Sequence, residues 1–402
     1  MNIYLCGPTV YSEVHIGNLK PILTFDIFIR SLRYLDKKVI FIHNITDIDD
    51  NIITKASSLG VTEIEISEKY ANLYLEELKT YNIIEPNEMP KVTTNIEGIV
   101  NLISRLIKTK SAYIVNSNVY FDVNSQNGYG KLSNRSLETI RSSSSSEKRN
   151  DEDFALWKST DMGVQFNSPW GKGRPGWHTE CAYFIEKYTR NQGSDLHGGG
   201  IDLLFPHHEN ENIQFIALHN KPITKEWKHI GHVMMDDAKM SKSLGNVFGS
   251  KEFAQEFGAD TLRFLYLTSS ITAPVNLKQT EIEQAKNKID SFHKVFNKAQ
   301  LVGMAPLASE KIKEIAIHIS QWKFSKALKN VYQIIKFFNN NPSPESAKDV
   351  YEIIKLLGFS FTNNKISEND KNDYHEWKCL LVNKNFDMAD KVRTKLIKNK
   401  II

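Results

Sequence analysis

Two short segments, far apart in the 402-residue chain, carry side chains that could bind a triphosphate from two sides. The first is His-Ile-Gly-Asn at residues 15–18, and the second is Lys-Met-Ser-Lys-Ser at residues 239–243. Lysines on a loop can close over phosphates and stabilise the charge that develops as pyrophosphate leaves. The pair therefore predicts attack on the α-phosphate of ATP. The predicted catalytic side chains are His15, Asn18, Lys239 and Lys242.

The first segment lies where a predicted strand turns into a predicted helix. Residues 2–6 are rich in apolar side chains and end at a Gly-Pro pair, as in a buried strand followed by a break. Apolar residues then recur every three or four positions over residues 19–35, which predicts a helix. The N–H groups and the positive dipole end of a helix N-terminus favour phosphate, and Gly17 lets the backbone approach it. A capping or core role for His15, and a simple solvated loop for the lysines, are the alternative interpretations.

A third group of residues could bind a metal ion. The chain has three cysteines without any Cys-x-x-Cys pair, so a zinc ribbon is excluded and a reducing compartment is favoured. His207 and Glu211 are four residues apart on a helix predicted to begin at Pro206, and so share one face. With Cys6 and Cys181 they make a plausible zinc set. Two separate core cysteines and a helical ion pair fit the same spacing.

A glycine run before that helix could bind a nucleoside. The sequence at residues 197–202 is His-Gly-Gly-Gly-Ile-Asp. Gly199 and Gly200 would let the backbone approach adenine, and Asp202 could accept hydrogen bonds from the ribose hydroxyls. A tight turn followed by a helix cap is the alternative interpretation of the same residues.

These segments resemble the motif series of the cysteinyl-tRNA synthetase family, within the class I aminoacyl-tRNA synthetases. The motifs are Cys-Gly-Pro-Thr-Val-Tyr at 6–11, Asn-Ile-Thr-Asp-Ile-Asp-Asp at 44–50, Gly-Trp-His-Thr-Glu-Cys at 176–181, His-Gly-Gly-Gly-Ile-Asp at 197–202 and Pro-His-His-Glu-Asn-Glu at 206–211. The resemblance implies four zinc ligands and two residues of a cysteine-binding pocket. The ligands would be Cys6, Cys181, His207 and Glu211, and the pocket residues Thr46 and Trp177. One Zn²⁺ per chain would bind the substrate thiolate and reject serine, because zinc prefers soft sulfur to a hydroxyl.

The resemblance also implies an activity, which is the ATP-dependent activation of L-cysteine to cysteinyl adenylate and its transfer to the 3' end of tRNA(Cys). ATP would be a substrate with Mg²⁺. Its expected contacts are His15, Gly17, Asn18, Gly199, Gly200, Asp202, Lys239 and Lys242. Two other functions stay open at this point. One is a mycothiol-type ligase that joins cysteine to an amino sugar, and the other is a non-catalytic RNA-binding paralog.

Three features depart from the family pattern. The fourth residue of the first segment is Asn18, where the wider class usually has histidine, so this donor cannot carry a charge. The chain begins almost at the first strand, without the usual short lead. It also ends soon after a helix-like segment at residues 385–396, so the terminal piece that helps to read the anticodon is expected to be shortened. The basic residues crowded near the end could face RNA phosphates or form a solvated helix face.

The predicted fold is α/β, with a Rossmann-like parallel-sheet catalytic domain that contains an insertion and is followed by a helical C-terminal domain. Its expected parts are 1–95 (catalytic domain, first half), 96–153 (connective insertion), 154–232 (catalytic domain, second half, with the zinc site), 233–300 (lysine loop and linking helices) and 301–402 (helical tRNA-binding domain). The chain is 41% hydrophobic with a net charge of +4, which is typical of a cytoplasmic enzyme, and a monomer is expected. No apolar stretch approaches the ~20 residues needed to cross a membrane.

Overall fold

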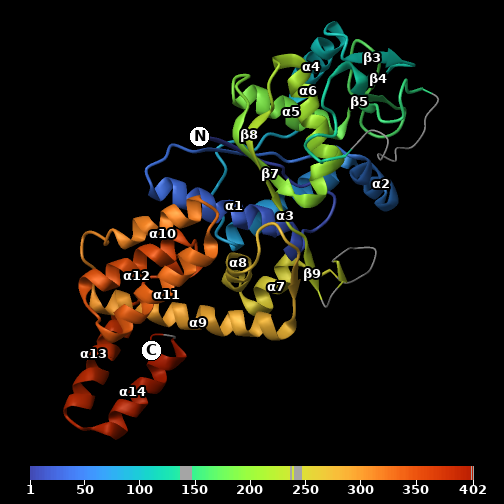
Figure 1. Ribbon diagram of the computed structural model, residues 1–402. Coiled ribbons are helices and arrows are strands. Elements are labelled where there is room, and N and C mark those ends of the chain that lie inside the picture. The colour runs from blue at the N-terminus through green and yellow to red at the C-terminus, as the bar shows by residue number, and fades with distance from the viewer. Residues whose placement is uncertain (136–146, 236–237, 240–246, 400, 402) are drawn as a thin grey trace.

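The computed structural model describes residues 1–135, 147–235, 238–239, 247–399 and 401. A four-stranded parallel sheet in the order β2-β1-β7-β8 lies at its centre (Figure 1). Its strands are β1 (Asn2–Leu5), β2 (Ile40–His43), β7 (Ser194–Gly200) and β8 (Thr224–Ile230). The last three residues of β1 are fully buried, as expected for an inner strand of a parallel sheet. The predicted α/β fold with a parallel sheet is confirmed.

Helices connect these strands, as the crossover connections of a parallel sheet require. α1 (Ile16–Tyr34) joins β1 to β2, which is followed by α2 (Asp50–Leu59) and α3 (Glu63–Thr80). α5 (Trp177–Tyr188) precedes β7, and α6 (Glu209–His219) joins β7 to β8. The sequence therefore alternates strands and helices in the two halves that carry the predicted motifs.

Two of these helices begin at other residues than predicted. The first helix was expected over residues 19–35, but α1 begins at Ile16, because the extended backbone of His15 caps it. Asn18 therefore lies in the first turn of the helix. The helix predicted from Pro206 begins at Glu209, after a separate π-helical turn (Leu204–His208) whose second residue has extended backbone.

An insertion built on an antiparallel sheet separates the two halves of the parallel sheet. It begins with α4 (Ile96–Lys108) and continues with β3 (Ala112–Val115), β4 (Asn118–Phe121), β5 (Phe154–Ser159) and β6 (Gly173–Pro175). These strands form one sheet in the order β3-β4-β5-β6. The boundary expected at residue 153 falls inside this sheet, because β5 pairs with β4 and β6 pairs with β5.

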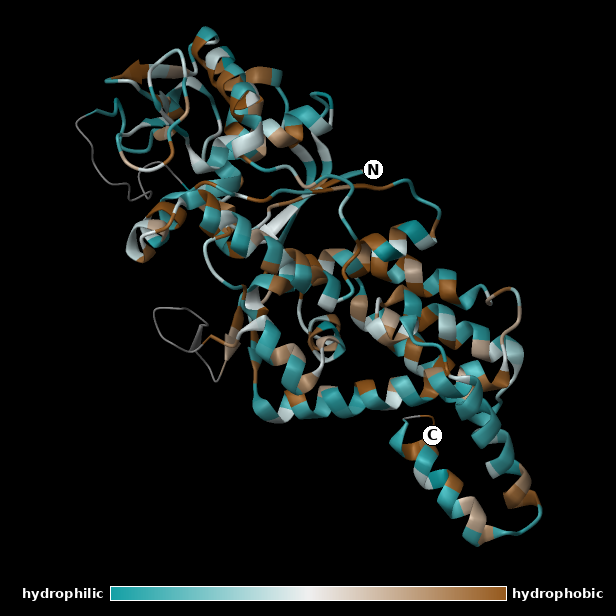
Figure 2. Ribbon diagram, turned by 180° about the vertical axis from the view of Figure 1, so that it is seen from behind, coloured by the Kyte–Doolittle hydropathy of each residue, from teal (hydrophilic) through white to brown (hydrophobic). Residues whose placement is uncertain are grey.

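Helices dominate the chain after the parallel sheet, as predicted. A small sheet comes first, in the order β10-β9-β11, with β9 (Val233–Met235), β10 (Ala238–Lys239) and β11 (Val275–Leu277). The helices are α7 (Ser250–Phe257), α8 (Ala259–Thr268), α9 (Gln279–Val302), α10 (Lys311–Ser320), α11 (Phe324–Asn340), α12 (Pro344–Leu356), α13 (Glu368–Val382) and α14 (Phe386–Lys398). α13 and α14 form a hairpin that extends away from the other helices, and hydrophilic residues cover much of it (Figures 1 and 2). Among the described residues, no helix is both long and apolar enough to span a bilayer.

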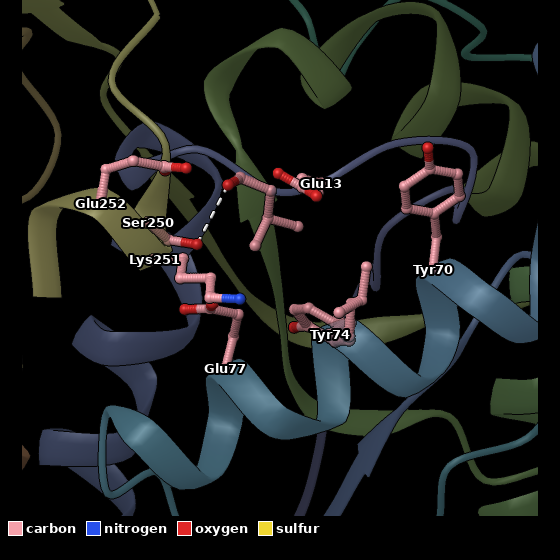
Figure 3. A pocket seen from close by; sticks show the side chains of 9 residues that line it. Glu13, Tyr70, Tyr74, Glu77, Ser250, Lys251 and Glu252 are labelled. Atoms are coloured by element: carbon pink, nitrogen blue, oxygen red, sulfur yellow. Dashed lines mark hydrogen bonds between the residues drawn. The ribbon is translucent and has the colours of Figure 1, made fainter. Parts of the chain in front are cut away.

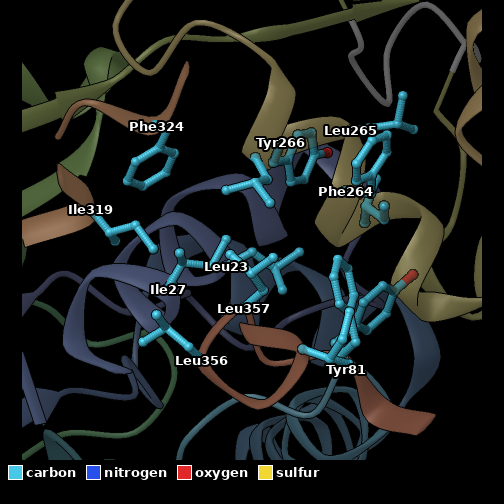
Figure 4. Packing of buried hydrophobic residues seen from close by; sticks show 14 of the residues in the cluster. Leu23, Ile27, Tyr81, Phe264, Leu265, Tyr266, Ile319, Phe324, Leu356 and Leu357 are labelled. Atoms are coloured by element: carbon cyan, nitrogen blue, oxygen red, sulfur yellow. The ribbon is translucent and has the colours of Figure 1, made fainter. Parts of the chain in front are cut away.

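A buried ion pair ties the parallel-sheet region to the helices that follow it. The guanidinium of Arg263 in α8 donates to the carboxylate of Asp26 in α1, and its Nη2 donates to the Tyr81 carbonyl at 2.6 Å. Both charged side chains are fully buried, beside the apolar contacts between α1, α8 and the end of α12 in Figure 4. Arg30 also donates to Asp26, at 2.8 Å. Without Arg263, Asp26 would keep only this second, partly exposed cation.

We expect Arg263→Met to lower the free energy of unfolding by about 3 kcal/mol, because removal of one partner leaves a buried carboxylate poorly compensated. Urea denaturation followed by tryptophan fluorescence measures the change. The exposed pair between Lys313 and Glu310 supplies the control, and Lys313→Ala should leave the unfolding midpoint nearly unchanged. If both variants shifted the midpoint equally little, the buried pair would not stabilise the fold.

Candidate active site

The carboxyl ends of the parallel strands meet at one edge of the sheet, where open α/β folds bind their ligands. Cys6 follows β1, Asn44 follows β2, Gly200 ends β7 and Gly231 follows β8. A cavity of about 570 Å³ opens at this edge. Seven predicted site residues line it, namely Cys6, His15, Gly17, Asn18, Trp177, Gly200 and Asp202. Five others whose side chains the structure describes are not among its lining residues, namely Thr46, Cys181, Gly199, His207 and Glu211.

The N-terminal end of α1 contributes polar groups to the cavity wall. His15 is the N-cap residue, and its backbone N–H donates to Oδ1 of Asn18 at 3.0 Å. This bond occupies the amide oxygen of Asn18, whose exposed side chain lines the cavity. The NH₂ group of the amide is therefore the part of Asn18 that can donate to a ligand. An uncharged donor at a helix N-terminus suits a phosphate oxygen.

Only the first residue of the second predicted triphosphate-binding segment is among the described residues. Lys239 lies in β10, opposite Met234 of β9, and Lys242 lies outside the described residues. Where the description resumes, Ser250 donates from its N–H and its hydroxyl to the Val14 carbonyl, at 3.1 and 3.0 Å (Figure 3). Residues 239–243 are called the lysine segment below. The chain that follows this segment is therefore anchored beside the start of α1.

A second, small cavity lies next to this anchor (Figure 3). It measures about 20 Å³ and is lined by the loop before α1, by α3 and by the start of α7. Glu13, Glu77 and Glu252 surround it with Lys251. This volume holds roughly one water molecule. The cavity is therefore too small to be a substrate site.

The four predicted metal ligands meet beside the large cavity. The Sγ atoms of Cys6 and Cys181 lie 3.9 Å apart, and both cysteines are free of disulfides. Nε2 of His207 lies 2.9 Å from Oε1 of Glu211, and that oxygen lies 3.6 Å from the Sγ of Cys6. The four ligand atoms are all within 4.8 Å of one another. Zn–S bonds of about 2.3 Å in a tetrahedral site separate two sulfurs by roughly 3.8 Å, so the thiol spacing fits such a site.

Neighbouring charges set the protonation of this cluster. Burial disfavours a charged imidazole, but the Glu211 carboxylate raises the pKa of His207 to about 10. Burial also disfavours a thiolate, yet a hydrogen bond from Cys6 lowers the pKa of Cys181 to about 6. Burial raises the pKa of Cys6 itself. The protein therefore favours a thiolate at Cys181, which is the form of cysteine that binds metals.

Two histidines that the sequence analysis did not single out support these ligands. Burial holds the pKa of His178 well below its usual value. The imidazole of His178 is therefore neutral, and its Nδ1 accepts from Nδ1–H of His207, 3.0 Å away. His197 donates from Nε2 to Oε2 of Glu211 at 2.7 Å. Partners of this kind fix the orientation of metal ligands.

His208 belongs to a second possible ligand set, with Cys6, His197 and Glu211. Its Nε2 lies 3.4 Å from the Sγ of Cys6, and its Nδ1 lies 2.9 Å from Nε2 of His229. The two sets share Cys6 and Glu211, so they describe alternatives for one ion. The set with two thiols matches the preference of zinc better. The sequence signal for His208 was the second histidine of the His-His pair.

Asn44, which follows β2, links this strand to β1 next to the two thiols. Its Oδ1 accepts from the hydroxyl of Tyr4 at 3.0 Å and from the N–H of Gly7 at 2.9 Å. A Cβ at position 7 would lie 1.6 Å from the Asn44 carbonyl oxygen, so only glycine fits there. Nδ2 of Asn44 donates to Thr46, whose buried hydroxyl donates to Glu180. The contact of Thr46 with a substrate therefore stays a prediction.

Trp177 lies on the cavity wall at the first position of α5. It is 39% exposed, and its ring centroid is 4.3 Å from that of His207. Cys181 follows it by four residues, so the two side chains share a helix face. One helix thus positions both a wall residue and a predicted metal ligand.

The glycine run forms the end of β7, and not a tight turn. Gly200 and Asp202 line the cavity. A Cβ on Gly199 would come within 2.8 Å of a terminal methyl group of Leu203 and 3.1 Å of His208, so any larger residue would force these two side chains to shift. The contacts of these residues with adenine and ribose stay predictions.

Comparison with known proteins agrees with this geometry. Residues 1–287 match the family model of the class I tRNA synthetase (C) catalytic domain. The chain is 39% identical to a cysteine--tRNA ligase from Mesomycoplasma hyopneumoniae, over 99% of this chain and 96% of that protein. It is 38% identical to a cysteine--tRNA ligase from Mycoplasma mycoides, over 100% of this chain and 96% of that protein.

The fold also resembles that of solved synthetases. A methionyl-tRNA synthetase from Mycobacterium tuberculosis, in complex with methionyl-adenylate, aligns with a TM-score of 0.64. The alignment covers 89% of each chain at 15% identity, which concerns the fold alone. The family model spans more than half of the sequence, and the named relatives align along nearly its whole length. The chain therefore belongs to the cysteine--tRNA ligase family of class I tRNA synthetases.

Proposed function

We propose that this chain activates L-cysteine with ATP to form cysteinyl adenylate, and then transfers the cysteine to the 3' end of tRNA(Cys). The observation that carries the proposal is that a cluster of two thiols, an imidazole and a carboxylate adjoins a cavity that also contains a helix N-terminus. The first feature suits a sulfur substrate and the second suits a triphosphate. Their shared cavity would bring the carboxylate of cysteine to the α-phosphate of ATP.

The ligand cluster fits one Zn²⁺, which Cys6, Cys181, His207 and Glu211 would hold. When bound, zinc would bind the substrate thiolate in preference to a serine hydroxyl. His178 would keep His207 in the orientation that presents Nε2 to the metal, and His197 would do the same for Glu211. Trp177 and Thr46 would bound the amino-acid pocket.

Residues on the other cavity walls would bind ATP with Mg²⁺. His15, Gly17 and Asn18 would contact the phosphates at the helix end, and Asp202 would accept from the ribose, with Gly199 and Gly200 beside adenine. Lys239 and Lys242 would stabilise the charge on the departing pyrophosphate. The protein's main contribution is thus to hold both substrates in reacting contact.

We expect Asn18→Ala to lower kcat for adenylate formation by about 10²–10³-fold, the usual cost of losing one preorganised donor. Zinc content and the KM for cysteine should stay nearly unchanged. Cysteine-dependent exchange of pyrophosphate into ATP measures the effect. Asn18→Asp is the informative companion, because it keeps the capping oxygen but loses the NH₂ donor. It should fold like the parent and be at least as slow as Asn18→Ala, and normal exchange in Asn18→Asp would exclude the donor role.

We propose that the helical region after residue 301 binds the tRNA. In the described part of the terminal hairpin, ion pairs involve Lys371 and Lys395. This leaves several cations on the hairpin that can face phosphates. They are Lys384, Lys391, Arg393 and Lys398. The extension of the hairpin away from the body (Figure 1) suits contact with a distant part of an RNA.

Two assays test the proposed function. Pyrophosphate exchange that depends on cysteine, and far less on serine, is expected first, followed by charging of purified tRNA(Cys). The mycothiol-type ligase and the non-catalytic paralog are not favoured, because the relatives named cysteine--tRNA ligase align over nearly the whole chain. Transfer to glucosaminyl-inositol instead of tRNA, or no exchange at all, would restore one of them.

We also propose that the enzyme acts as a monomer in the cytoplasm, where Cys6 and Cys181 would stay reduced for the metal. Light scattering on the zinc-loaded protein should give the mass of a single chain.

A further inference from the structure

Lys20 is a buried cation that the proposed mechanism does not use. It lies in α1, two residues after Asn18, and is 1% exposed. Its Nζ donates to the carbonyl of Gly231 at 3.0 Å and to that of Ala273 at 3.4 Å. Burial lowers the pKa of Lys20 to about 8, so the amine is still largely protonated at neutral pH. Within the part of the chain that the structure describes, no carboxylate pairs with this amine, and carbonyl dipoles meet its charge.

The two carbonyls belong to the base of the small sheet that carries the lysine segment. Gly231 connects β8 to β9 and lines the large cavity. Its N–H donates to the Ile271 carbonyl at 2.9 Å. A Cβ at position 231 would lie 2.2 Å from the Ala273 carbonyl oxygen, so the two segments touch through a glycine. β9 then pairs with β11 on one side and with β10, which carries Lys239, on the other.

We propose that Lys20 is a positioning residue for adenylate formation. It fixes the β9–β10 hairpin, which carries the first residue of the lysine segment, against the N-terminal end of α1, where His15 lies. This inference rests on the proposed function. The two phosphate-binding segments must stand at a fixed separation if they are to meet the same triphosphate. Lys20 is a direct link between them, because it belongs to the helix of the first segment and bonds to the base of the second. It does not line the cavity and so acts through the hairpin.

Lys20→Met should lower kcat for cysteine-dependent pyrophosphate exchange by about 10–100-fold, as expected for a small misplacement of reacting groups. The KM for cysteine should stay nearly unchanged, because the zinc cluster is not displaced. Lys20→Arg, which keeps donors for both carbonyls, should recover most of the activity. Thr24→Val is the matched control, since Thr24 is equally buried in α1 and its hydroxyl donates only to the Lys20 backbone carbonyl, at 2.7 Å. It should retain kcat.

A double-mutant cycle with Lys239→Ala separates positioning from general damage. If Lys20 acts through the hairpin, Lys20→Met should slow exchange much less in the Lys239→Ala background than in the parent. If Lys20→Met fails to fold, Gly231→Ala can replace it in the cycle, because it disturbs the same contact from the other side. Its effect should likewise be non-additive with that of Lys239→Ala. Multiplicative effects of the two substitutions, or an equal loss in Thr24→Val, would overturn the role of Lys20. If the unmodified protein showed no cysteine-dependent pyrophosphate exchange, this result would instead overturn the proposed function.

Discussion

Cys181→Ser is expected to abolish binding of the zinc ion that we propose for this cluster, together with most of the preference for cysteine over serine. The Sγ of Cys181 lies 3.9 Å from that of Cys6, and its low pKa makes it the readier thiolate of the pair. A hydroxyl is a poor zinc ligand, so the remaining three donors should not retain the ion during gel filtration. Discrimination between the two amino acids should then fall to what pocket shape supplies, about 10–200-fold. Metal analysis and exchange assays with each amino acid measure both effects.

Cys379→Ser is the control for this experiment. Cys379 is an exposed free cysteine in α13, outside both possible ligand sets. Its replacement should leave one zinc per chain and full selectivity. A Cys181→Ser protein that kept stoichiometric zinc and the parental selectivity would refute the assignment of Cys181 as a ligand. His208 in place of Cys181 would then be the ligand to test, since it belongs to the alternative set.

Lys239→Ala and Lys242→Ala should each reduce kcat for adenylate formation by about 10²–10³-fold. The KM for ATP should rise much less, because the charge that these lysines would meet in the proposed mechanism grows as pyrophosphate departs. Transfer of a preformed cysteinyl adenylate to tRNA should suffer little, since pyrophosphate has gone by then. Rapid-quench measurement of the two half-reactions distinguishes these steps.

Lys251→Ala controls for loss of positive charge near the same segment. Lys251 is exposed at the start of α7 and lines only the small cavity, so both half-reactions should stay near the parental rate. Equal damage to activation and transfer in the Lys239 and Lys242 variants would mean that the segment supports the fold or the tRNA, and not the phosphates.

The order of elements was predictable because it depends on local patterns. An apolar run before a Gly-Pro pair gave β1, and the three- and four-residue spacing gave α1. The start of α1 was missed by three residues, because capping by His15 depends on its extended backbone and on the Asn18 side chain. The end of the insertion was missed for another reason. β5 joins the insertion only through pairing with β4, which lies more than 30 residues earlier in the chain.

The candidate site was predictable in its ligand types but not in its surroundings. Motifs identified Cys6, Cys181, His207 and Glu211, and the structure brings their ligand atoms together. The supporting histidines were not found, since a histidine beside a ligand looks in sequence like any buried histidine. Lys20 was missed for the same reason, because only tertiary contacts bring backbone carbonyls to its amine.

The ligand cluster draws on both ends of a long stretch of chain, with Cys6 and Glu211 205 positions apart. During translation Cys6 leaves the ribosome first, and the last ligand is synthesised roughly 10–40 s later at about 5–20 residues per second. The nascent chain therefore spends about half of its synthesis with an incomplete ligand cluster and an unliganded thiol. β1 likewise lacks β7, its neighbour in the sheet, until nearly the same point of synthesis. Loading of the proposed metal and closure of the central sheet must thus both wait until more than half of the chain has been synthesised.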